Sequence, residues 1–157
     1  MNISWDDYFM SIAYLASLRS KDINTKVGAC IVSQNNKILS TGYNGAPRKF
    51  NDDNVPSGNS GEWLNTKYPY VCHSELNALL NYGGSLLDLN NSKVYVTLFP
   101  CNECAKALAQ AGIIEIIYME DKHHDDDIYV ASRKILDECG IIYRQHTIKD
   151  IKISLNN

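Results

Sequence analysis

The stretch KVYVTLFPCNEC, residues 93–104, passes from a strand pattern into a helix start and carries two cysteines across the junction. Because Pro100 stands at this junction, Cys101 falls in the first helical turn, and Cys104 follows three residues later on the same side. The helix N-terminus and a bound metal both favour the thiolate form of cysteine. The stretch therefore predicts a strand, a helix and a chelating pair of sulfurs between them.

A second helix start, VCHSELNALL at 71–80, has the same order of an extended segment, a potential ligand and an apolar run. If the two starts lie side by side, His73 joins Cys101 and Cys104 around one ion. Three protein ligands leave a coordination position for water, which is typical of a catalytic rather than a structural zinc site. Glu75 can reach the same cavity from the first turn and take a proton from that water.

Cys72 precedes His73 and could in principle be a fourth ligand that closes the site. Neighbouring side chains point about 100° apart in a helix and to opposite faces in a strand. We therefore expect Cys72 to face away from the ion. Cys30 and Cys139 lie in apolar stretches, and we expect both to be small core residues.

Outward from these motifs the chain alternates between helical and strand patterns. A helix is expected from Ser4 to about Arg19, followed by a hairpin of the segments 27–33 and 37–43. The later elements are helices at 74–82, 102–111 and 127–138 and strands at 93–99, 114–119 and 141–146. This order predicts an α/β fold with a mixed sheet. The stretch 44–70 holds three of the four prolines and is expected to be a long loop at the rim of a site.

Length and composition limit the possibilities further. The 157 residues, 45% of them hydrophobic, suit one compact domain over 1–157. The chain shows no apolar run of membrane-spanning length and no signal-peptide pattern at its start, so we expect a soluble, cytoplasmic protein without a membrane partner. A net charge of -3 disfavours long nucleic acid as a partner but allows a local basic pocket.

The two motifs together, His73-Ser74-Glu75 and Pro100-Cys101-Asn102-Glu103-Cys104, resemble the H-x-E…P-C-x-x-C signature of the zinc-dependent cytidine and deoxycytidylate deaminase family. The similarity extends over about residues 8–146 and points to the deoxycytidylate branch. The stretches that carry it are GYNGAP at 42–47, NTKYPYVCHSELNAL at 65–79, YVTLFPCNECAK at 95–106 and the segment around YMEDKHHDDD. The resemblance implies a cytidine-deaminase-like, three-layer α/β/α fold with a mixed five-stranded sheet.

The resemblance also implies a role for individual residues. His73, Cys101 and Cys104 would bind Zn²⁺ and Glu75 would be the proton shuttle. The implied substrate contacts are the side chain of Asn44 to the sugar hydroxyl, the backbone of Ser74 to a pyrimidine carbonyl, and Lys122 near the 5′-phosphate. Gly42, Gly45 and Arg48 would belong to an effector or phosphate loop.

The chain departs from the family pattern at two places. Position 74 is usually Ala in the family and is Ser here, which adds a hydroxyl near the site. Arg48-Lys49-Phe50 follows GYNGAP where a glycine is usual. His123 and His124 stand beside Lys122 at the carboxyl edge of the sheet and could add positive charge there, although three aspartates follow them.

The implied activity is hydrolytic deamination of dCMP to dUMP and ammonia by a zinc-activated water, with Glu75 as proton shuttle, feeding dTMP synthesis. The resemblance further implies activation by dCTP with Mg²⁺, inhibition by dTTP and a homo-oligomer, a hexamer. The alternatives are a dCTP or dual dCMP/dCTP deaminase, a base or tRNA deaminase, a non-catalytic zinc or redox protein, and a nucleotide sensor without turnover. The acidic net charge disfavours tRNA.

Overall fold

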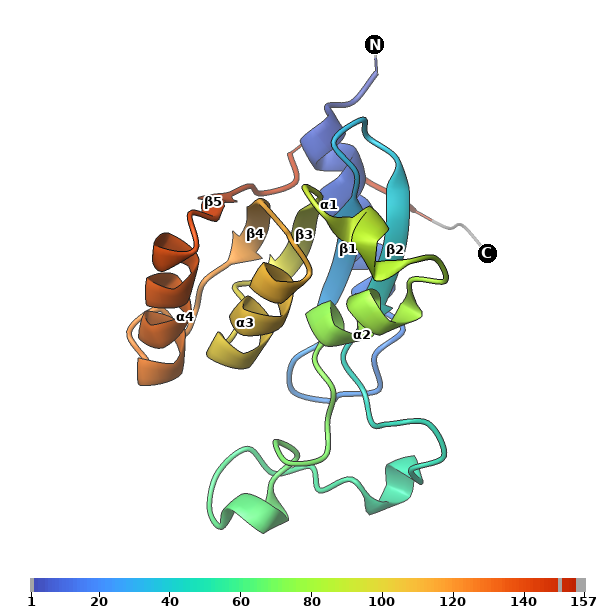
Figure 1. The fold of residues 1–157 in the computed structure, drawn as a ribbon. Coiled ribbons are helices and arrows are strands. Elements are labelled where there is room, and N and C mark those ends of the chain that lie inside the picture. The colour runs from blue at the N-terminus through green and yellow to red at the C-terminus, as the bar shows by residue number, and fades with distance from the viewer. Residues whose placement is uncertain (1, 150, 155–157) are drawn as a thin grey trace.

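The computed structural model describes residues 2–149 and 151–154. Its order of helices and strands is the one that the sequence patterns predict, with ends that differ by one or two residues. In chain order the main elements are α1 (Trp5–Ser17), β1 (Gly28–Val32), β2 (Ile38–Tyr43), α2 (Ser74–Asn81), β3 (Lys93–Leu98), α3 (Asn102–Gln110), β4 (Glu115–Glu120), α4 (Asp127–Glu138) and β5 (Ile142–Gln145). Figure 1 shows their arrangement.

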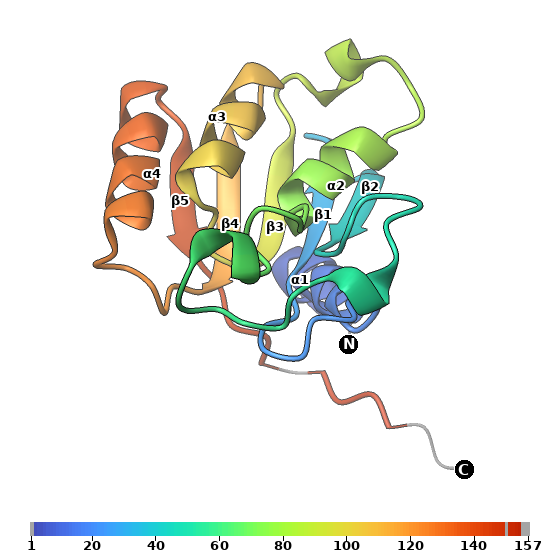
Figure 2. The same cartoon turned by 90° about the horizontal axis from the view of Figure 1, so that it is seen from below.

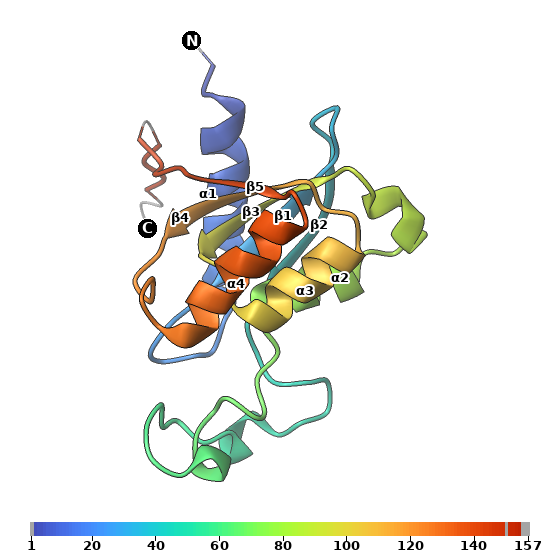
Figure 3. The ribbon, with the colours of Figure 1, turned by 60° about the vertical axis from the view of Figure 1, so that its left-hand side comes forward.

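The five strands form one mixed sheet in the order β2-β1-β3-β4-β5. β1 pairs antiparallel with both β2 and β3, whereas β3, β4 and β5 are parallel to one another. Helix α1 covers one face of the sheet, and α2, α3 and α4 cover the other (Figures 2 and 3). The predicted three-layer α/β/α architecture with a mixed five-stranded sheet is confirmed.

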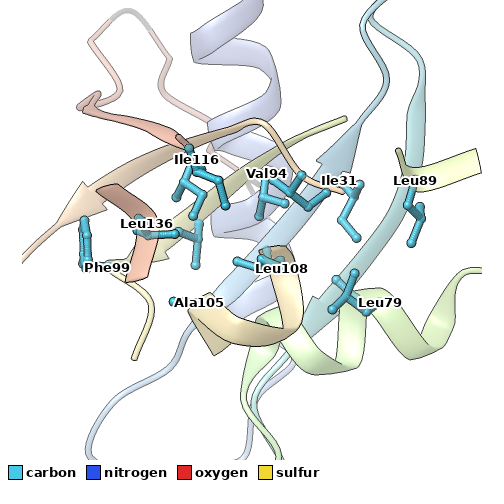
Figure 4. Close-up of a cluster of buried hydrophobic side chains, with 14 residues drawn as sticks. Ile31, Leu79, Leu89, Val94, Phe99, Ala105, Leu108, Ile116 and Leu136 are labelled. Atoms are coloured by element: carbon cyan, nitrogen blue, oxygen red, sulfur yellow. The ribbon is translucent and has the colours of Figure 1, made fainter. Parts of the chain in front are cut away.

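A buried apolar cluster lies between the sheet and the three helices α2, α3 and α4 (Figure 4). Strands β1, β3 and β4 contribute Ile31, Val94 and Ile116 to it, and the helices contribute Leu79, Leu108 and Leu136, among others. A smaller cluster around Phe9, Met10 and Tyr95 fills the α1 face. Because β1, β3 and β4 are covered on both faces, they are apolar along most of their length.

Helix α1 begins as the sequence predicts. The Ser4 hydroxyl accepts a hydrogen bond from the Asp7 backbone N–H at 3.0 Å and caps the helix. The carboxylates of Asp6 and Asp7 point toward the last strand, where Asp6 pairs with Arg144 and Asp7 with His146 at 2.7 Å each. These contacts join the two ends of the chain across one face of the sheet.

The parallel pairing of β3 and β4 places their carboxyl ends at one edge of the sheet, where Leu98 lies opposite Glu120. The segment 44–73 extends away from this body of the molecule (Figure 1). It contains the short 3-10 turns Asp52–Asn54 and Trp63–Asn65 and is otherwise irregular, as predicted for the long loop. Its two ends are held together by reciprocal backbone hydrogen bonds between Gly45 and Cys72, at 3.0 and 2.8 Å.

The structure confirms one of the two cysteine predictions for the core and contradicts the other. Cys30 is fully buried on β1. Cys139 is exposed, because it is the residue that ends α4, where the chain turns away through Gly140 at a φ of 69°. In the described residues no helix is both long and apolar enough to cross a membrane.

Candidate active site

Two helix starts form the core of the site. His73 is the N-cap of α2 and Cys101 is the N-cap of α3, and each residue has an extended backbone that turns into its helix. Helices α2 and α3 lie next to each other on the same face of the sheet (Figures 1 and 2). The two caps therefore meet, as the repeated sequence pattern predicts.

The three predicted ligands converge at this point. His73 Nδ1 lies 3.3 Å from Cys101 Sγ and 3.6 Å from Cys104 Sγ, and the three ligand atoms all lie within 4.8 Å of one another. A tetrahedral Zn²⁺ with bonds of about 2.1 Å to nitrogen and 2.3 Å to sulfur would hold these atoms about 3.5 Å apart. The residues therefore fit the ion. Within residues 2–149 and 151–154, no other trio of His, Cys, Asp or Glu side chains is close enough to share a metal.

The scaffold fixes each ligand by contacts with the neighbouring elements. The Cys104 backbone N–H donates to Cys101 Sγ at 3.4 Å, which orients that sulfur inward. The Ser132 hydroxyl on α4 donates to the Pro100 carbonyl at 2.8 Å and holds the turn before Cys101. On the other side, the Ser40 hydroxyl on β2 donates to the Ala78 carbonyl of α2 at 2.7 Å.

Glu75 lies on the first turn of α2 and is almost completely buried, with 3% of its surface exposed. The hydroxyl of the fully buried Ser74 donates a hydrogen bond of 2.6 Å to Glu75 Oε1. Burial raises the pKa of Glu75, and the charge of His73 and the hydrogen bonds with Cys104 and Ser74 oppose that rise. A carboxyl with a raised pKa is suited to accept and return a proton near neutral pH.

The candidate ligand residues shift one another's pKa values. The hydrogen bond with Cys101 raises the pKa of His73 to about 9. The Cys104 thiol donates to Cys101, which lowers the pKa of Cys101 and raises that of Cys104. Binding of a metal requires neutral imidazole and thiolate ligands, so uptake of the ion would release these protons.

A cavity of about 110 Å³ opens in front of Glu75, His73 and Cys101. Its wall comes from distant parts of the chain. The segment after β4 contributes His123, α4 contributes Tyr129, and the turn before β1 contributes Thr25. The His123 and Tyr129 rings stack with their centroids 5.5 Å apart. Because the cavity is reached by Glu75 and by two of the predicted metal ligands, it is the candidate active site.

Asn44 and Ser74, which were predicted to contact substrate, both line this cavity. The side chain of Asn44 also has a structural role: its Oδ1 accepts from the Val27 N–H and its Nδ2 donates to the Thr25 carbonyl, both at 2.9 Å. One amide hydrogen and one lone pair remain for a ligand. The backbone N–H of Ser74 lies in the first turn of α2, where helix geometry leaves it without an intrahelical acceptor.

Lys122 is placed differently from the other predicted contacts. It is exposed and does not line the cavity, and its ammonium donates to Thr25 Oγ1 at 3.2 Å. Lys122 therefore contacts Thr25, a residue of the cavity wall, without lining the cavity itself. Its predicted contact with a phosphate group stays a prediction.

Of the three residues of the predicted effector or phosphate loop, Gly45 alone lines one of the two cavities described. Gly45 lines a second cavity of about 470 Å³, whose wall comes from the segments 19–24 and 43–57 together with Lys67 and Val71, whereas Gly42 and Arg48 do not line it. Gly42 packs against α2 so closely that a Cβ would lie 2.3 Å from Ala78 N. Asn44 belongs to the walls of both cavities, so the two spaces are neighbours.

Several residues of the cavity wall carry no motif in the sequence, among them Lys67 and Tyr129. Lys67 lies within the stretch NTKYPYV, ahead of the His73 motif, and Tyr129 stands in the first turn of α4. Its place at the start of the helix that follows β4, near the carboxyl edge of the sheet, is the signal that could have identified Tyr129. Lys67 carries no such signal, because only the fold of the long loop brings it to the cavity.

Comparison with known proteins agrees with this geometry. A sequence model described as the cytidine and deoxycytidylate deaminase zinc-binding region matches residues 3–120. The chain belongs to this deaminase family. The family and the His73, Cys101 and Cys104 cluster together support zinc as the metal.

Relatives within the family are similar over almost the whole chain. The deoxycytidylate deaminases of Pongo abelii and Homo sapiens are each 48% identical over 155 residues, covering 98% of this chain and 86% of theirs. A crystal structure of dCMP deaminase from the cyanophage S-TIM5, in complex with dCMP and dUMP, is 28% identical with a TM-score of 0.73. It covers 93% of this chain and 99% of the phage protein.

Proposed function

We propose that this deaminase hydrolyses dCMP to dUMP and ammonia. The observation that carries the proposal is the position of Glu75, buried in one cavity beside His73 and Cys101 with Cys104 completing the metal cluster. The deoxycytidylate deaminases that resemble the chain at 48% identity support the choice of substrate.

The proposed reaction replaces the C4 amino group of the pyrimidine with oxygen from water. When bound, zinc would supply a Lewis acid that makes water nucleophilic near neutral pH. Glu75 takes a proton from the attacking water and delivers it to N3 of the ring. The same carboxyl then takes the proton of the new C4 hydroxyl and delivers it to the amino group; the C4 carbonyl forms as the C4–N4 bond breaks and ammonia departs.

The other residues of the cavity orient the substrate. The backbone N–H of Ser74 would donate to the pyrimidine carbonyl, and the free amide hydrogen or lone pair of Asn44 would meet the sugar hydroxyl. Lys122, behind Thr25, would contribute positive charge at the phosphate end. The walls from α4 and the long loop would keep bulk water away from the reacting carbon.

Regulation and assembly belong to the same proposal. We infer activation by dCTP with Mg²⁺, inhibition by dTTP and a hexameric assembly, acting in the cytoplasm to supply dUMP for dTMP synthesis. The resemblance to the family supports these traits. The second cavity, with Arg19, Lys21 and Lys49 in its wall, offers cationic side chains for a polyphosphate next to the first cavity.

The test is an ammonia-release assay on dCMP, dCTP, deoxycytidine and CMP, each with and without added dCTP and dTTP, together with zinc per chain and mass by light scattering. We expect turnover of dCMP in preference to the other three substrates and one zinc per chain. Preference for dCTP would favour the triphosphate deaminase instead. A zinc-loaded protein that releases no ammonia from any of them would contradict the proposal.

A further inference from the structure

The wall of the candidate active-site cavity contains one Lys or Arg side chain among the residues described, Lys67. Its side chain is 13% exposed, and its ammonium lies 2.6 Å from Oδ2 of Asp22, which is 8% exposed. A cationic group is thus held in a largely buried position, on the same cavity as Glu75 and His73.

Asp22 is itself held rigidly. Its other oxygen, Oδ1, accepts hydrogen bonds from the backbone N–H groups of Asn24 at 2.8 Å and Thr25 at 2.9 Å. The carboxylate therefore fixes the turn before β1 and the Lys67 ammonium together. An ammonium has three N–H donors and Asp22 Oδ2 takes one of them, so two remain for a ligand in the cavity.

The same turn brings a second group to this end of the cavity. Thr25 lines the cavity, and its hydroxyl oxygen accepts from Lys122 at 3.2 Å. The hydroxyl proton of Thr25 is then available to donate elsewhere. The 22–25 turn thus holds the Lys67 ammonium through Asp22 and provides the Thr25 hydroxyl. Both groups can donate hydrogen bonds to a phosphate oxygen.

We propose that Lys67, held by Asp22, reads the 5′-phosphate of the substrate and thereby sets the preference for a nucleotide over a nucleoside. This inference rests on the proposed deamination of dCMP and names the group that distinguishes it from deoxycytidine. A phosphate dianion that enters the cavity needs a cation close by, because it loses part of its hydration shell there. Lys67 supplies this charge as a residue of the cavity wall, whereas Lys122 lies outside the wall and contacts Thr25.

A purely structural role for Lys67 is the competing explanation, since its ion pair ties the long loop to the turn before β1. The two roles differ in what removal of the charge affects. If the ion pair has only a structural role, its removal should lower stability and reduce activity on dCMP and deoxycytidine equally. A phosphate reader would act on dCMP and leave deoxycytidine unchanged.

The experiment compares four variants with the wild-type enzyme: Lys67→Met, the double variant Asp22→Asn with Lys67→Met, Lys122→Met and Lys106→Met. The double variant avoids leaving a buried carboxylate unpaired. Lys106 is the matched control, because it pairs with Glu103 at 2.8 Å on the exposed side of α3. Each zinc-loaded variant is assayed for kcat/KM on dCMP and on deoxycytidine, with melting temperature and zinc per chain as checks on folding.

We expect both Lys67 variants to lose about 10- to 100-fold in kcat/KM for dCMP, the range for one charge-assisted hydrogen bond. Their kcat/KM for deoxycytidine should stay within about twofold of wild type, on the same reasoning. Competitive inhibition by inorganic phosphate should weaken in parallel, and Lys106→Met should behave as wild type.

A folded double variant that keeps the wild-type preference for dCMP, or that loses both substrates equally, would overturn the role of Lys67. If that preference disappears only in Lys122→Met, Lys122 and not Lys67 recognises the phosphate. A wild-type enzyme that does not prefer dCMP over deoxycytidine would instead contradict the proposed function, and the inference with it.

Discussion

The hydroxyl of Ser74 donates a hydrogen bond of 2.6 Å to the carboxylate of Glu75, and both side chains are buried at the start of α2. Ser74 therefore restrains the orientation of the Glu75 carboxylate through Oε1. The second carboxylate oxygen does not take part in this hydrogen bond and can exchange protons in the cavity.

Replacing Ser74 with Ala should lower kcat about fivefold, the effect of losing about 1 kcal/mol of hydrogen bonding to the proton shuttle. KM and zinc content should not change, because the backbone N–H and the metal ligands remain. Steady-state kinetics and metal analysis provide the measurement. Ser40→Ala is the matched control, because it removes another buried serine hydrogen bond to α2 without touching Glu75. An equal loss of kcat in both variants would assign the effect to helix packing.

The variant Glu75→Gln should retain one zinc per chain and lose at least about 10²- to 10⁴-fold in kcat, the contribution of a positioned general acid and base. The amide keeps the shape of the side chain but cannot accept and return the proton. Rapid-mixing or endpoint ammonia assays would detect the residual rate. Glu103→Gln, on the exposed first turn of α3, should remain active. A near-normal rate for the Glu75 variant would exclude the assigned role.

Loss of one metal ligand should remove the ion. The variant Cys104→Ser should bind less than one tenth of the wild-type zinc, by the order of magnitude expected when one of three protein ligands changes. Its melting temperature should also fall, since metal binding stabilises the folded state. Zinc per chain by atomic emission and thermal unfolding are the measurements. Cys139→Ser, at an exposed position outside the cluster, should retain the ion.

The ion pair of α1 with β5 should make stability depend on pH in the acid range. The hydrogen bonds from Arg144 hold the pKa of Asp6 at about 2, below its ordinary value of 3.8. Because this pKa is depressed in the folded state, the stabilisation is complete above about pH 4 and is lost as the pH falls toward 2. We expect about 1–2 kcal/mol at neutral pH, allowing for solvent screening of the partly exposed pair.

Chemical denaturation of wild type and Asp6→Asn between pH 7 and pH 2 would measure this contribution. The difference in the free energy of unfolding should be constant at neutral pH and should shrink as the pH drops below 4. Asp125→Asn, which removes a negative charge from an exposed site, should show a much smaller difference. A difference that does not vary with pH would mean that Asp6 stabilises the fold by packing instead.

Of the two glycines in the GYNG stretch, only Gly42 should be sensitive to substitution by alanine. A Cβ at Gly42 would lie 2.3 Å from Ala78 N and 2.4 Å from the Ser74 carbonyl oxygen, so Gly42→Ala must displace the start of α2. We expect a loss of at least about 2 kcal/mol of stability together with weaker zinc binding. Gly45→Ala meets no atom within 4 Å and should fold normally. Thermal unfolding and zinc per chain test both variants.

The sequence by itself determined the order of elements, the mixed α/β class and the three candidate metal ligands that the structure brings together. It could do so because each depends on local patterns: apolar periodicity for the strands and helices, and ligand spacing at two helix starts for His73, Cys101 and Cys104. It also predicted that Glu75 would reach the same cavity as His73, since a separation of two residues places it in the first turn of α2.

Only the tertiary structure decided which residues surround the reacting centre. Lys67 reaches the cavity through the path of the irregular segment 44–73, and Thr25 and Tyr129 come from opposite ends of the chain. No local pattern encodes these contacts, because they depend on how a loop without periodicity packs against the turn before β1. The same reason explains Cys139, whose apolar neighbours predicted burial but whose place at the end of α4 leaves it exposed.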